Sequence, residues 1–85
     1  MIMAELGAIV AAMRRNSRNV RFWDFCRVCD AYFGAARKSG GSHRVYKTPW
    51  LGDPRVNIQN AKGKAKAYQV RQVLRAIEKL ENERD

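Results

Sequence analysis

The spacing of apolar residues changes twice along this chain of 85 residues, and this change limits the possible folds more than any other feature. Apolar residues recur three and four positions apart over residues 22–33, which is the spacing of one helix face. Residues 55–59 alternate between apolar and polar, as in a half-buried strand, and helical spacing returns over residues 70–80. Strands between two amphipathic helices predict an α+β fold.

Turn residues divide this pattern into expected elements. Helices are expected over residues 2–13, 23–32 and 67–81. Strands are expected over residues 35–38, 44–48 and 55–59. Between them we expect a Ser-Gly-Gly-Ser turn at 39–42, a loop over 49–54 and a basic loop over 60–66. The order after the first helix is that of an α-β-β-β-α sandwich, with a three-stranded antiparallel sheet and two helices.

The first 18 residues precede this pattern. We expect residues 1–18 to form a short N-terminal helical extension and linker, and residues 19–85 to form one domain. Arg14 and Arg15 follow the apolar stretch, whereas the positive charges of a secretory signal precede it. No run approaches the ~20 apolar residues of a membrane span. We therefore expect a cytoplasmic protein with no membrane partner.

Positive charge is concentrated in one part of the chain. The sequence has 17 basic and 8 acidic residues, which gives a formal net charge of +9. Residues 31–77 hold ten of the basic residues and a single acidic one, Asp53. A basic surface attracts polyanions through Coulomb forces and counterion release. Nucleic acid is therefore the leading candidate partner, and a membrane surface or an acidic protein is the alternative.

The two cysteines, Cys26 and Cys29, have C-x-x-C spacing within the helical apolar stripe. A zinc site needs four ligands, and His43 is the only further candidate. Buried cysteine behaves as a small apolar residue, so we expect both thiols to be reduced and packed in the core. Because Asp53 has no acidic neighbour in the basic half, a two-metal nuclease is also disfavoured, and we expect no metal site.

His43 is the only histidine, and it follows Gly40, Gly41 and Ser42 at the start of a strand. Histidine exchanges a proton near neutral pH, and RNA supplies its own nucleophile, the 2′-OH. One histidine could take that proton or give a proton to the leaving oxygen, while Lys and Arg stabilise the charge on phosphorus. A lone histidine is more often an ordinary surface or core residue. Strand alternation places His43 on the face of Val45, an expected core residue, so catalysis would require a splayed or bulged strand start.

Lysines alternate with small residues in the expected loop before the last helix, at Lys62, Lys64 and Lys66. This arrangement suits contact with phosphates, although a solvated charged loop would have the same composition, and the P-loop pattern is missing. Three aromatic residues could stack on unpaired bases or pack against the fold, namely Tyr46, Trp50 and Tyr68.

Several segments together resemble the HicA family of toxins. Residues 41–47 read Gly-Ser-His-Arg-Val-Tyr-Lys, and residues 56–59 read Val-Asn-Ile-Gln. Residues 63–74 read Gly-Lys-Ala-Lys-Ala-Tyr-Gln-Val-Arg-Gln-Val-Leu, and residues 19–25 are similar to the opening segment of the family. The resemblance covers residues 19–80, and the combination of segments at this separation is more specific than Gly-Ser-His alone.

The resemblance implies a fold like that of double-stranded-RNA-binding domains. It implies an mRNA interferase, which is a metal-independent endoribonuclease toxin of a type II toxin–antitoxin system, acting in stress response without a cofactor. It implies neutralisation by a HicB-type antitoxin that covers the active site. The catalytic histidine of the family corresponds to His43, preceded by Gly41 and Ser42. Further phosphate contacts are expected from basic residues around it, namely Arg44, Lys47, Lys62, Lys64 and Lys66.

Two other functions fit the same residues. A non-catalytic RNA-binding module would bind RNA through the basic surface and never cleave it. A basic adaptor would dock an acidic protein, and RNA would not compete for that binding.

Overall fold

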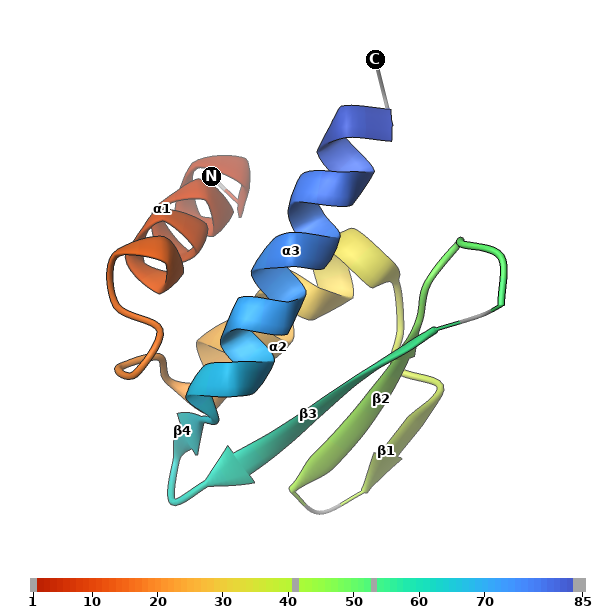
Figure 1. Ribbon diagram of the computed structural model, residues 1–85. Coiled ribbons are helices and arrows are strands. Elements are labelled where there is room, and N and C mark those ends of the chain that lie inside the picture. The colour runs from red at the N-terminus through yellow and green to blue at the C-terminus, as the bar shows by residue number, and fades with distance from the viewer. Residues whose placement is uncertain (1, 41, 53, 84–85) are drawn as a thin grey trace.

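The computed structural model describes residues 2–40, 42–52 and 54–83, and it shows helices packed on one side of an antiparallel sheet (Figure 1). The helices are α1 (Ile2–Arg15), α2 (Phe22–Phe33) and α3 (Ala67–Glu83). The strands are β1 (Lys38–Gly40), β2 (His43–Lys47), β3 (Arg55–Ala61) and β4 (Lys64–Ala65). The predicted α+β class is confirmed.

The sheet has the strand order β1-β2-β3-β4, with every neighbouring pair antiparallel. β1, β2 and β3 make up the expected three-stranded sheet, and β4 adds two residues along the end of β3. α2 and α3 contact the sheet, whereas α1 packs on α2 and α3. Within the described chain, no helix covers the other face of the sheet (Figure 1).

The region before the last helix differs from its prediction as a loop over residues 60–66. β3 continues to Ala61, and a two-residue turn then reverses the chain into β4. Lys62 and Gly63 both have positive φ, 55° and 89°, as a type I′ hairpin turn requires. The side chain of Asn60 fixes the turn, because its Oδ1 accepts a hydrogen bond from the Gly63 N–H at 2.6 Å.

The first strand was also predicted too early, at residues 35–38, whereas β1 spans Lys38–Gly40. Ala36 packs against the core, and the Arg37 N–H already donates to the Val45 carbonyl at 2.8 Å. The chain therefore already contacts β2 at Arg37, one residue before β1 begins. The predicted end of the second helix is confirmed, because Gly34 adopts a φ of 82° and its N–H donates to the Asp30 carbonyl.

One hydrophobic core joins all three helices to the sheet. α1 contributes Met13, which is fully buried, and Val10 to the same cluster as Phe25 of α2 and Ile58 of β3. The structure therefore places part of the expected N-terminal extension in the core of the α-β-β-β-α unit. No helix within the described residues is long and apolar enough to cross a membrane.

Both cysteines are buried in this core as free thiols, as the helical spacing predicted. Burial raises the pKa of the Cys29 thiol above its ordinary value, which keeps the thiol protonated and poorly nucleophilic. We expect a thiol reagent at pH 8 to label both residues far more slowly in the native protein than in urea. Fast stoichiometric labelling of either thiol without denaturant would contradict this packing.

Candidate functional site

His43 lies at the start of β2 and its side chain is exposed. Along β2 the fully buried residue is Tyr46, whose side chain faces the helices, and Arg44 shares this face because side chains alternate along a strand. The opposite face carries His43, Val45 and Lys47. We call it the uncovered face, because no helix of the described chain packs on it. The prediction that Val45 marks the core face was wrong, because the larger Tyr46 fills the core and Val45 is only partly buried. His43 therefore reaches solvent without the splayed or bulged strand start that was expected to be necessary.

The residues around His43 come from three elements that meet at one end of the sheet. His43 is directly opposite Gln59 of β3, and the Asn60 N–H donates to the Ser42 carbonyl at 2.8 Å. The β3–β4 turn follows immediately with exposed Lys62 and Lys64. In Figure 1 the start of β2, the end of β3, β4 and the start of α3 all lie at the lower end of the molecule.

The other predicted contacts are distributed more widely. Ser42 is exposed beside His43, whereas Gly41 lies outside the described residues. Lys66 is partly buried and directly precedes α3. Lys47 lies at the far end of β2, roughly 13 Å from His43 at the usual rise of a strand, and its register partner is Arg55. The uncovered face therefore carries basic residues at both ends.

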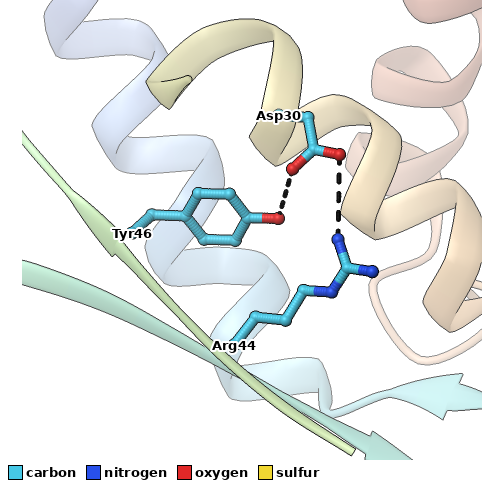
Figure 2. Close-up of polar contacts among 3 residues, drawn as sticks. All are labelled: Asp30, Arg44 and Tyr46. Atoms are coloured by element: carbon cyan, nitrogen blue, oxygen red, sulfur yellow. Dashed lines mark hydrogen bonds and ion pairs between the residues drawn. The ribbon is translucent and has the colours of Figure 1, made fainter. Parts of the chain in front are cut away.

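Arg44 is held on the helix side of the sheet, away from the face of His43 (Figure 2). Its Nη1 lies 3.7 Å from Asp30 Oδ2, and its guanidinium carbon lies 5.7 Å from the centre of the Trp23 ring. The Tyr46 hydroxyl donates to Asp30 Oδ1 at 2.6 Å, and burial raises the pKa of Tyr46, so this donor stays protonated. The structure therefore ties Arg44 to α2 and does not bring it together with His43.

The three candidate aromatic residues occupy different environments. Tyr46 is fully buried and cannot stack on a base. Trp50 donates from Nε1 to Glu83 Oε1 at 2.7 Å, and Lys79 Nζ lies 4.4 Å from its ring centre, so Trp50 packs against the end of α3. Tyr68, half-exposed at the start of α3, is the one of the three that remains available near the His43 end.

Two glutamines for which no role was predicted contact each other at this end of the sheet, and one of them, Gln59, is the register partner of His43. Gln69 of α3 is 3% exposed, and its Oε1 accepts from the Gln59 backbone N–H at 2.8 Å. Its Nε2 lies 3.3 Å from Gln59 Oε1 and 3.3 Å from the Tyr68 hydroxyl. The sequence gives no signal for these contacts, because they depend on the register of β2 with β3 and on where α3 begins.

Within the described residues, no group of three or more His, Cys, Asp and Glu side chains could hold a metal ion. Cys26 and Cys29 lie in the core, and His43 lies on the uncovered face. The arrangement at His43 offers an exposed imidazole, amide groups and nearby ammonium groups, which are suited to proton transfer beside a bound polyanion. No family model, no curated protein and no solved structure matches this chain.

Proposed function

We propose that this protein is an endoribonuclease that cleaves mRNA with His43 as its general base, as a HicA-like toxin of a type II toxin–antitoxin system. The fold that goes with this proposal is the double-stranded-RNA-binding-like α-β-β-β-α sandwich. The observation that carries the proposal is the exposed side chain of His43 on the uncovered sheet face, beside the basic β3–β4 turn. The resemblance of residues 41–47 and 63–74 to the HicA family supports it.

The reaction follows from the groups at this end of the sheet. The imidazole of His43 takes the proton of the ribose 2′-OH, and the 2′ oxygen attacks the adjacent phosphorus. The bond from phosphorus to the 5′ oxygen breaks, and that oxygen takes a proton from water. The products are a 2′,3′-cyclic phosphate and a free 5′-OH, and His43 releases its proton to solvent. Lys62 and Lys64 stabilise the negative charge that builds up on the phosphate oxygens.

A protein partner belongs to the same proposal. A HicB-type antitoxin would neutralise the protein by covering His43, and the uncovered sheet face is open to such contact. The place of action is the cytoplasm, where mRNA is available.

The direct test uses a single-stranded RNA and the same strand with 2′-deoxyribose throughout. We expect cleavage of the RNA in the presence of EDTA, with 2′,3′-cyclic phosphate and 5′-OH ends, because the mechanism needs no metal ion. The deoxy strand should bind and stay intact, because it lacks the nucleophile. Binding of both strands without cleavage would favour the non-catalytic RNA-binding module. Failure to bind either strand would favour an adaptor for an acidic protein.

The basic turn gives a second prediction, about affinity. Replacing Lys62, Lys64 and Lys66 by Gln should weaken RNA binding about tenfold or more at 50 mM salt and flatten its salt dependence, by a slope of ~0.7 for each lost phosphate contact. The matched control removes three charges from the helix layer, at Arg71, Arg75 and Lys79. In the helix layer, Arg71 donates a hydrogen bond to Ser17 Oγ, and the ammonium group of Lys79 lies over the Trp50 ring. Equal losses in both triple variants would show that net charge matters and the turn does not.

A further inference from the structure

The carboxamide of Gln59 is the polar group opposite His43, and the structure determines which way it points. His43 and Gln59 are register partners in the antiparallel pair of β2 and β3. The neighbouring pair, Ser42 and Asn60, exchanges a backbone hydrogen bond, so His43 and Gln59 form the non-hydrogen-bonded type of pair. In such pairs the two side chains leave the same face, with Cβ atoms about 4.5–5.5 Å apart.

A chain of hydrogen bonds fixes the orientation of both glutamine side chains. A backbone N–H can only donate, so the Gln69 atom that meets the Gln59 N–H at 2.8 Å is the oxygen. The other end of the Gln69 amide is then the NH₂ group, which must donate to Gln59 and to the Tyr68 hydroxyl. Gln59 therefore presents its oxygen to Gln69, and its own NH₂ group points away from that contact.

This NH₂ group is a donor that has no acceptor among the residues that the structure describes. Within the described chain, Gln59 Nε2 donates no hydrogen bond, although the other atoms of the two amides are engaged. Gln69 is buried on α3, so rotation of the Gln59 amide would break a contact that solvent cannot easily replace. The register of β2 and β3 places Gln59 directly opposite His43, and the contact with Gln69 of α3 fixes which end of its amide is left as a neutral donor.

We propose that Gln59 is a substrate-contact residue, which donates from Nε2 to a non-bridging oxygen of the RNA phosphate beside His43. Gln69 is its positioning residue, because it selects the orientation of the Gln59 amide without touching RNA. This inference rests on the proposed cleavage at His43 and adds a specific donor to it. A neutral donor at a fixed position stabilises charge that develops on the phosphate as the 2′ oxygen attacks.

The first experiment compares Gln59→Glu with Asn57→Asp. Gln59→Glu keeps the oxygen that Gln69 requires and removes the NH₂ donor. Asn57→Asp makes the same amide-to-carboxylate change on the same strand face, at an exposed position opposite Val45. We expect the single-turnover cleavage rate to fall about 10²-fold or more in Gln59→Glu, as for other donors to developing oxyanions. The control should lose about fivefold or less. Equal losses in the two variants would overturn the proposal.

The second experiment tests the positioning role of Gln69 through Gln69→Glu. A carboxylate at this position still accepts from the Gln59 N–H but cannot donate to the Gln59 oxygen. The Gln59 amide should then rotate and present its NH₂ group to α3, which removes the donor from the site. We expect a cleavage loss similar to that of Gln59→Glu, although Gln59 itself is unchanged. A purely structural role for Gln69 would lower the melting temperature and leave the rate of the folded fraction unchanged.

A readout without cleavage separates this inference from the proposed function. The Gln59 side-chain NH₂ signals of ¹⁵N-labelled protein should shift when the 2′-deoxy strand is added, and this response should disappear in Gln69→Glu. Wild-type protein that cleaves RNA while these signals stay fixed would overturn the inference and leave the role of His43 intact. Wild-type protein that shifts these signals but never cleaves would overturn the proposed reaction and retain Gln59 as an RNA contact.

Discussion

His43→Ala is expected to lower the rate of RNA cleavage by about 10²- to 10⁴-fold, the usual contribution of a general acid–base residue. The affinity for the 2′-deoxy strand should change little, because the lysines of the β3–β4 turn remain in place. The fold should also be retained, since the side chain is exposed and makes no hydrogen bond within the described residues. Rates are measured under single-turnover conditions so that binding and chemistry separate.

Asn57→Ala is the matched control for this variant. Asn57 is exposed on the neighbouring strand, and its register partner Val45 shares the uncovered face with His43. The Asn57→Ala variant should keep most of the wild-type cleavage rate, because Asn57 transfers no proton in the proposed mechanism. Cleavage of RNA at the wild-type rate by His43→Ala protein would contradict the proposed mechanism. A matching loss in Asn57→Ala would point to a general disturbance of this face.

Met13→Ala is expected to lower the free energy of unfolding by about 2–5 kcal/mol, as in other substitutions of large buried side chains. Met13 is fully buried in the cluster shared by α1, α2 and α3. A small domain has a total stability of only about 5–15 kcal/mol, so this loss should be visible as a large decrease in the urea midpoint.

Leu6→Ala on the same helix provides the graded comparison. Leu6 is only partly buried against the core, so its truncation should have a smaller effect than Met13→Ala. Both variants should unfold in a single transition if α1 and the rest of the chain share one core. An unchanged urea midpoint in Met13→Ala, measured by tryptophan fluorescence, would mean that residues 1–18 are dispensable to the fold.

Apolar spacing predicted the three helices and the central strands to within a few residues, because it reports which face of each element is buried. β4 was missed, since a two-residue strand has no periodicity and the Lys-Gly turn is a weaker hairpin signal than Asn-Gly. The core face of β2 was also misjudged. Val45 and Tyr46 are adjacent apolar residues, and only packing against α2 shows that Tyr46 is the buried one.

Of the candidate site, only the part that depends on the chemistry of one side chain could be predicted from the sequence. His43 could be singled out because it is the only histidine and begins a strand after glycines. The attachment of Arg44 to Asp30 and Trp23 could not be predicted, because it depends on how α2 crosses β2. The pairing of Gln59 with Gln69 likewise depends on strand register and on the position of α3.

The conformation of Lys62 has a consequence for the evolution of this protein. A φ of 55° is a left-handed backbone, which costs a residue other than glycine or asparagine roughly 1–2 kcal/mol. Asparagine is the residue that such a hairpin turn favours at this position. Selection for thermal stability alone would therefore favour Lys62→Asn and remove a positive charge from the end of the sheet at which RNA binding is proposed. Survival of lysine here among related sequences would indicate selection for charge over stability.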